Sequence, residues 1–229
     1  MDTSAKVTSV SIVSDTQVLS EFNIDTKLTH SQALMPMLQA ALSCAKLSLD
    51  DIDGFAVSSG PGSFTGLRIG IGAIKGLSYA SNKPCVAVST LKALAYNLQG
   101  IDGIVCPVMD ARCNQVYTAI FESTPSGLVR ISKDEAITID ELIENLKSYK
   151  KNIFFVGDGA DLCYNKSKNC LESIYLADNG RKQQKAAMVG VCALEEFASG
   201  NTVSAAELAP VYLRLPQAQR ERLARMGKI

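Results

Sequence analysis

The amino-acid sequence predicts an α/β protein built from two related lobes. Short apolar runs of β-type residues alternate with stretches in which apolar residues recur every three or four positions, as strands alternating with helices do. The order hairpin, helix, strand, helix occurs twice in the 229 residues. A polar break at 99–103 separates the two series, so we expect a first lobe over 1–100, a second over 101–204, and packing of 205–229 back on the first.

The elements of the first half follow from local signals. The polar break 14–17 lies between two β-rich runs and predicts a hairpin. Apolar residues at helical spacing predict a helix over 33–45, with Thr29 or Ser31 as its cap and Pro36 in its first turns. The remaining expected elements are a strand over 52–58, a helix over 65–80, a strand over 85–88 and a helix over 91–98.

The second half repeats this order. Asp110 ends an apolar run, and a polar turn then leads into β-type residues. The expected elements are a strand over 116–121, a helix over 138–150, a strand over 152–159 and a helix over 183–198. The repeated order, with almost no identical residues between the halves, favours two lobes packed face to face.

Composition limits the classes of function. Lys plus Arg equals Asp plus Glu at 23 each, so no global charge attracts nucleic acid or a membrane surface. The seven cysteines form no C-x-x-C pair and read as reduced core residues. No signal peptide or membrane-length apolar run is present, so we expect a cytoplasmic protein without a membrane partner. The basic tail over 210–229 is either a solvated face or a contact for RNA or a partner.

The stretch GPGSFTGLRIGIG at 60–72 resembles a phosphate-binding loop and lacks its defining residues. A Walker A loop requires Lys and Ser or Thr where Leu67 and Arg68 stand, and a dinucleotide loop requires Gly at Thr65. The serine-hydrolase motif G-x-S-x-G is also absent. Amides at a helix N-terminus still bind anions, so the candidate anion or nucleotide contacts are Gly62, Ser63, Thr65 and Arg68.

The helix after this loop carries small residues on one side. Glycine inside a helix costs about 1 kcal/mol relative to alanine, and close approach of another helix offsets that cost. One interpretation is tight packing inside the lobe, and the other is an interface with another subunit. The predicted interface residues are Gly66, Leu67, Gly70, Ile71, Ala73, Ile74 and Leu77, with Leu34, Met37 and Leu38 of the preceding helix.

Five motifs in this order resemble the TsaB (YeaZ) family, which belongs to the pathway that makes threonylcarbamoyladenosine beside the tRNA anticodon. They are GPGSFTGLRIGIG, VAVSTLKALA, MDARCNQVY, VGDGA and PVYLR, and the resemblance covers nearly the whole chain. It implies the actin, Hsp70 and sugar-kinase (ASKHA) fold with two RNase H-like lobes. It also implies an accessory, catalytically silent subunit that dimerises with a TsaD-like catalytic subunit, which a TsaE-like ATPase joins. Alone, such a subunit pairs with itself, and it meets tRNA only through the complex.

The resemblance further implies that catalytic and metal sites are absent. Thr90 and Leu94 stand where catalytic relatives have the H-x-x-x-H metal ligands. The stretches 2–4 and 157–159 keep the residues of nucleotide loops, whereas 110–113 lacks their glycines, and we expect Arg112 to fill the cleft. No cofactor is therefore expected on the isolated subunit, and ATP or ADP only in the assembled complex.

The alternative function is a glycoprotease-like or ASKHA-type ATP-dependent enzyme, against which the missing H-x-x-x-H and Walker motifs count. The only histidine, His30, is more readily a capping or surface residue than the partner of Ser63 in a catalytic triad. Family members also have an apolar strand before the turn 2–4, of which only Met1 remains here, so we expect the natural start to lie upstream.

Overall fold

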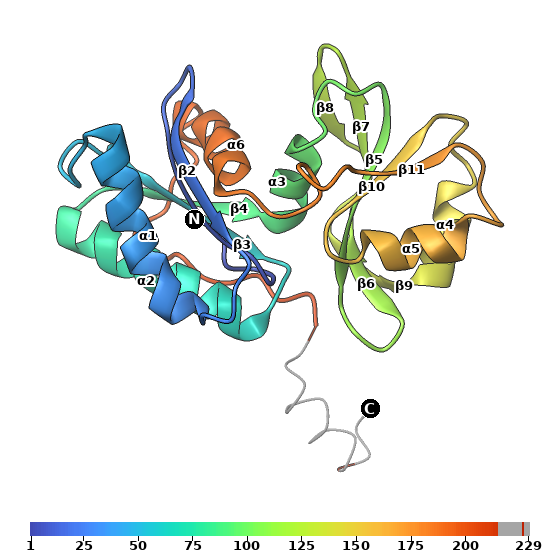
Figure 1. The fold of residues 1–229 in the computed structure, drawn as a ribbon, viewed down its shortest axis with the longest axis horizontal. Coiled ribbons are helices and arrows are strands. Elements are labelled where there is room, and N and C mark those ends of the chain that lie inside the picture. The colour runs from blue at the N-terminus through green and yellow to red at the C-terminus, as the bar shows by residue number, and fades with distance from the viewer. Residues whose placement is uncertain (215–225, 227–229) are drawn as a thin grey trace.

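The chain folds into two lobes that lie side by side (Figure 1). The structure is a computed structural model that describes residues 1–214 and 226. Most of the basic tail considered above lies outside the described residues. Within the described part, no helix is both long and apolar enough to cross a membrane.

The first lobe is a sheet covered by helices on both faces. Alternate residues of one strand show this arrangement, because Val10 and Ile12 pack in the core with α1, whereas Ser9 and Val13 contact α6. The four strands form two pairs: β1 and β2 run antiparallel, and β3 and β4 run parallel. The elements are β1 (Thr8–Val13), β2 (Val18–Ile24), α1 (His30–Ala45), β3 (Phe55–Gly60), α2 (Phe64–Ser81), β4 (Cys85–Ser89), α3 (Thr90–Tyr96) and α6 (Ala186–Ala198).

Helix α6 corrects the predicted extent of the second lobe. It lies in the range 101–204 assigned to that lobe, yet it contacts β1, β3, β4 and α3 of the first. Val86 and Val88 of β4 pack with Val189, Cys192 and Ala193 of α6, so this apolar side of the first lobe needs a helical cover. The chain after α6 stays on this lobe, because Val203 pairs with Cys85 and Leu208 is buried in the first core.

Residues Met1 and Asp2 join the two strand pairs of the first lobe. The Met1 α-amino group donates to the carbonyl of Ala56 at 2.8 Å, and the Ser58 amide donates to the carbonyl of Met1 at 3.1 Å. On the other side, Asp2 and Ser9 exchange both backbone hydrogen bonds at 2.9 Å. An apolar groove lined by β1, β3 and α6 adjoins Met1. The upstream start stays a prediction.

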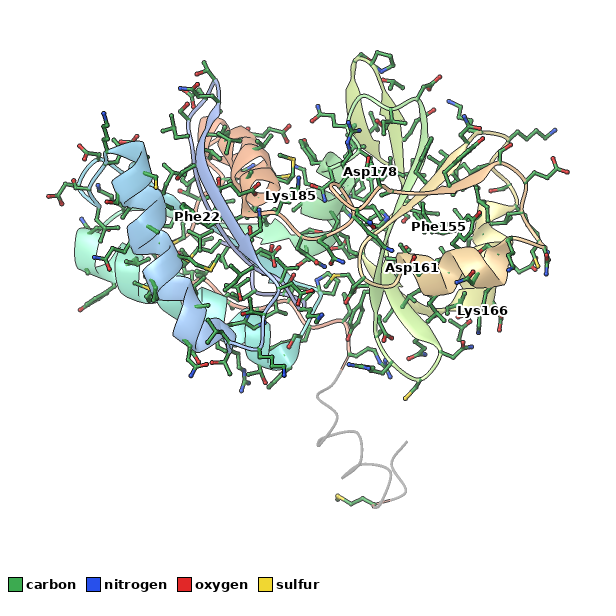
Figure 2. All side chains as sticks on the ribbon, in the orientation of Figure 1. Phe22, Phe155, Asp161, Lys166, Asp178 and Lys185 are labelled. Atoms are coloured by element: carbon green, nitrogen blue, oxygen red, sulfur yellow. The ribbon has the colours of Figure 1, made fainter. Side chains whose placement is uncertain are left out.

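The second lobe is built on a seven-stranded sheet whose main path is β11-β10-β5-β6-β9, with β7 and β8 extending from β5. Strand β5 runs parallel to β10 and antiparallel to β6 and β7. Phe155 lies fully buried inside this lobe (Figure 2). The elements are β5 (Gly103–Asp110), β6 (Gln115–Thr118), β7 (Phe121–Thr124), β8 (Gly127–Arg130), β9 (Glu135–Thr138), α4 (Ile139–Leu146), β10 (Ile153–Val156), α5 (Ala160–Ser167) and β11 (Ile174–Leu176).

One predicted strand of the second lobe is two. The expected strand over 116–121 divides into β6 and β7 with a break at 119–120. The break arises because the carbonyl of Ile120 accepts from the amides of Ile131 and Ser132 instead of continuing the ladder. Strand β6 then pairs with the end of β5, and β7 pairs with its beginning.

The buried α-amino group of Met1 predicts a pH dependence of stability for the chain that begins there. Burial lowers the pKa of this group from 8.0 to about 6, so the folded state disfavours its charged form. Stability is therefore complete above about pH 8 and falls toward pH 6, by about 2 to 3 kcal/mol at 1.36 kcal/mol per pKa unit. Urea unfolding between pH 5.5 and 8.5 measures the change. The N-terminally acetylated chain is the control, and an identical pH profile for it would contradict the assignment.

Candidate functional site

A cleft of about 790 Å³ separates the two lobes. Its walls are formed by loops together with the ends of α2, α5 and β5 and part of β6. Asp161 lies on the side of the second lobe that faces the first (Figure 2), where Lys182 donates to it. The lining residues include Ser4, Lys6, Gly62, Ser63, Thr65, Asp110, Arg112, Asp158, Asp161, Lys182, Tyr212 and Arg214.

The first-lobe wall is formed by the N-terminal turn of α2, which packs directly on the backbone of Thr3 and Ser4. The Ser63 amide donates to the carbonyl of Ser4 at 2.6 Å, and Thr3 Oγ1 donates to the carbonyl of Gly66 at 2.7 Å. A Cβ added to Gly62 would lie 2.5 Å from the Ser4 carbonyl oxygen, and one on Gly66 would lie 2.0 Å from that of Thr3. These two glycines therefore permit a close contact inside the lobe.

The carboxylate of Asp2 is enclosed by its hydrogen-bond partners Ser4 and Ser58. Its Oδ1 accepts from the amide of Ser4 at 2.8 Å and from Ser4 Oγ at 2.7 Å, and its Oδ2 accepts from Ser58 Oγ at 2.5 Å. Only 1% of Asp2 is exposed. Because both oxygens already hold hydrogen bonds and face inward, Asp2 is not among the groups that line the cleft.

The four predicted anion contacts are divided by the structure. Gly62, Ser63 and Thr65 line the cleft, whereas Arg68 does not. Ser63 Oγ accepts from the amide of Gly66 at 3.2 Å and so caps α2. The Leu67 amide donates to the carbonyl of Ser63, so the amides of Gly66 and Leu67 are both bonded to Ser63.

Arg68 belongs instead to a stacked group with Phe64 and Tyr212, which themselves line the cleft. Its guanidinium lies 3.9 Å from the ring centroid of Phe64, and its Nε donates to the hydroxyl of Tyr212 at 3.1 Å. The rings of Phe64 and Tyr212 stack with centroids 4.6 Å apart. Phe64 and Tyr212 were not among the predicted site residues, because 144 positions separate Arg68 from Tyr212 and no local sequence pattern relates them.

The second-lobe wall carries acidic residues around a tight turn. The Arg112 amide donates to Asp110 Oδ1 at 2.7 Å, and the Arg112 side chain is 84% exposed. Arg112 therefore lines the cleft without filling it, because most of its side chain remains in contact with water beside Asp110. Withdrawal from water between the walls, followed by the negative charge of Asp110, raises the pKa of Asp158.

The positions of the metal ligands of catalytic relatives lie in the protein interior. Thr90 begins α3 and is fully buried, and its Oγ1 has no hydrogen-bond partner within residues 1–214 and 226. Leu94 is 1% exposed and packs with Leu98 and Val156. Among residues 1–214 and 226, no three His, Cys, Asp or Glu side chains gather as metal ligands would. His30 lies elsewhere, with its Nδ1 2.6 Å from Thr8 Oγ1.

Most of the predicted partner-interface residues belong to the core of their own lobe, and this corrects the prediction. A Cβ on Gly70 would lie 2.4 Å from Thr3 Oγ1 and 3.3 Å from Val57, so this side of α2 faces inward. Helical spacing identified a small-residue face correctly but did not show its direction. The buried residues are Gly66, Leu67, Gly70, Ile71, Ile74, Leu34, Met37 and Leu38, while Ala73 and Leu77 are half-buried.

A second small-residue face of α2 points to solvent. Gly72 and Gly76 are exposed, and an added Cβ on either would meet no atom within 4 Å. Tyr79, at the end of the helix, is 85% exposed. On the neighbouring α1, the outward residues include Met35, which is 45% exposed. We call Met35, Gly72, Gly76 and Tyr79, together with the half-buried Ala73, the outer helix face.

Comparison with known proteins places this architecture. The chain is 32% identical over 217 residues to the tRNA threonylcarbamoyladenosine biosynthesis protein TsaB of Escherichia coli, covering 93% of each chain. This chain belongs to the TsaB (YeaZ) family. It is also 31% identical over 162 residues to TsaB of Bacillus subtilis, covering 71% of each. The family model of TsaD, tRNA N6-adenosine threonylcarbamoyltransferase, matches residues 18–221.

Solved structures of the family agree with the fold. YeaZ from Pseudomonas aeruginosa superposes with a TM-score of 0.79 at 26% identity, covering 93% of this chain and 97% of that one. A second Pseudomonas aeruginosa structure, described as similar to the peptidase YEAZ, has a TM-score of 0.81 at the same identity. The expected fold class, an α/β protein of the ASKHA superfamily with two RNase H-like lobes, is confirmed.

The two glycine faces of α2 predict opposite effects of one substitution. Gly70→Leu pushes a side chain into Thr3 and Val57 and should lower the free energy of unfolding by about 3 kcal/mol or more, as overpacking does. Gly72→Leu enters open space and should match or exceed the parent, because leucine favours helix. Thermal and urea melts of both variants measure the difference. Equal melts for the pair would show that Gly70 does not face the core.

Proposed function

We propose that this chain is an accessory, catalytically silent subunit in the biosynthesis of threonylcarbamoyladenosine in tRNA. Relatives that match it over most of their length carry the name of that pathway. The proposed mode of action is binding: the chain dimerises with and supports a TsaD-like catalytic subunit, and a TsaE-like ATPase joins the pair. The site of action is the cytoplasm.

The observation that carries the silent role is the enclosed carboxylate of Asp2. ASKHA kinases use an acid in the first turn of each lobe together with small residues that let phosphate approach. Here Asp2 is buried and bonded to Ser4 and Ser58, so this acid is already committed to holding the turn. Thr90 and Leu94 are likewise buried where the catalytic relatives carry metal ligands. Nucleotide is therefore assigned to the assembled complex and not to the isolated subunit.

The partner surface is assigned to the outer helix face. Gly72 and Gly76 have open space above them, and a helix of another subunit can approach a backbone that lacks side chains. Met35 and Tyr79, which belong to this face and are exposed, supply apolar and aromatic contacts of the kind enriched in interfaces. The same face serves for self-association of the chain when the partner is absent.

Contact with tRNA is proposed to be indirect. The 23 basic and 23 acidic residues cancel, and in the cleft Lys6 and Lys182 are already paired with Asp25 and Asp161. Nucleic-acid affinity depends on unpaired cations that release phosphate counterions. The substrate tRNA is thus expected to be held by the complex.

The experiment that tests this proposal adds a charged side chain to the outer helix face. Gly72→Arg and Gly76→Arg should fold like the parent, because their surroundings are open, and should bind the TsaD-like subunit at least about tenfold more weakly, which corresponds to about 1.4 kcal/mol. Asn145→Arg on α4 adds the same charge to an exposed helix position of the second lobe and serves as the control. Calorimetric titration with the purified partner measures the affinity.

Two outcomes would contradict the proposal. Unchanged affinity in both glycine variants would show that the partner binds elsewhere. Hydrolysis of ATP or of a glycoprotein by the isolated chain at rates typical of enzymes, about 1 per second or more, would favour the alternative of an ATP-dependent or glycoprotease-like enzyme.

A further inference from the structure

The chain that follows α6 is anchored on the first lobe as far as Val211. Val203 and Cys85 exchange backbone hydrogen bonds at 2.8 and 2.9 Å, and the Val211 amide donates to the carbonyl of Ser59 at 2.7 Å. Gly60 permits this approach, because a Cβ there would lie 2.2 Å from the Val211 carbonyl oxygen. In Figure 1 this orange to red segment ends between the two lobes.

The next three residues reach both sides of the cleft. Tyr212 stacks on Phe64, and its hydroxyl accepts from Arg68 of α2. Arg214 crosses to the second lobe, where its guanidinium donates to the carbonyl of Ala111 in the turn between β5 and β6. One short segment thus contacts both lobes, and all of these side chains except Arg68 border the cleft.

The turn that receives Arg214 is strained. Arg112, Cys113 and Asn114 have φ values of 65°, 55° and 58°, so three consecutive residues with side chains occupy the left-handed region. Such a conformation persists only where surrounding contacts hold it. The contacts of this turn include Arg214 at Ala111 and Lys166 at Asn114. A strained turn held partly by the opposite lobe is suited to change when that contact is lost.

A second, independent tie joins the lobes away from Arg214. Ser89, at the start of α3, donates to Asp134 Oδ2 at 2.6 Å, and Arg130 donates to Asp134 Oδ1 at 2.5 Å and to Ser89 Oγ at 3.2 Å. None of these three residues lines the cleft. The lobes also share a buried core, in which Leu94 and Leu98 pack with Val105, Phe121 and Val156. With the polar tie and this core intact, loss of the contact at Ala111 permits the lobes to turn relative to each other without separating.

We propose that residues 211–214 form a strap that holds the cleft closed, with Tyr212 fixed to α2 and Arg214 fixed to the β5–β6 turn. Release of either end allows the lobes to open and the turn to relax. The strap contacts are few and lie near the surface, so they can break without unfolding either lobe. The proposal does not depend on whether a partner occupies the outer helix face.

The test measures the distance between the lobes in the full chain. The exposed cysteines Cys44 in the first lobe and Cys170 in the second carry spin labels, after Cys113→Ser removes the third exposed thiol. Arg214→Gln and Tyr212→Ala should each shift the mean distance between the labels by more than the width of the parent's distribution, and should also broaden the distribution. Tyr212→Phe keeps the stacked ring and loses the hydroxyl, and it should give an intermediate shift.

A matched control and a second readout keep the test decisive. Arg181→Gln neutralises an exposed arginine whose guanidinium pairs with Asp178 at 3.7 Å, and it should leave the distribution unchanged. Melting curves of all variants should stay cooperative, which separates opening from unfolding. Distributions identical to the parent in both Arg214→Gln and Tyr212→Ala would overturn the strap. So would an equal shift in Arg181→Gln, since the effect would then be one of charge alone.

Discussion

The contact on which the structure depends most is that between the first turn of α2 and the backbone of Thr3 and Ser4. It requires Gly62 and Gly66, since a methyl group on either would overlap a carbonyl oxygen. In the adjoining turn at residues 2–4, the hydroxyl of Ser4 donates a hydrogen bond to Asp2, and this bond holds the Asp2 carboxylate away from the cleft. It also sets the start of α2, from which Phe64 and Arg68 meet Tyr212. A single close backbone contact therefore determines the enclosed acid, the cleft wall and the position of the strap.

The sequence predicted the order of elements well because their signals are local. Alternating apolar runs and helical spacing indicated the sheet and its helices, and Thr29, Ser63 and Thr138 lie at the caps where short polar residues are expected. The packing partner of α6 could not be read this way. Its pattern shows an apolar face but not which of two sheets needs covering, and the chain returns to the first lobe after the second is complete.

The site was predicted less well for a related physical reason. Spacing along α2 grouped Gly66 and Gly70 correctly, yet a helix with small residues on two sides has two candidate faces, and only the position of Thr3 decides which one is buried. Arg68 was identified as important but assigned to an anion, since its actual partners Phe64 and Tyr212 include one from the far end of the chain. Family resemblance supplied the fold and the pathway; the geometry supplied which residues are interior.

In the proposed role, this family member acts through its surfaces rather than through a reactive centre. The acid that the fold offers for chemistry is used to hold a turn, and the small residues that resemble a phosphate loop are used for packing. The surfaces available for binding are the outer helix face and the cleft between the lobes, which the strap holds closed. Both are arrangements suited to holding other molecules in position.

We expect the turn at residues 2–4 and helix α2 to form one unit that opens only when the first lobe unfolds. Amide hydrogen exchange tests this most directly. The amides of Ser58 and Ser63 donate to the carbonyls of Met1 and Ser4, so their exchange reports each half of the contact. We expect both amides to exchange with the free energy of global unfolding, as amides of the buried strand β1 should. Exchange of either amide as fast as that of the exposed hairpin turn at 14–17 would contradict it.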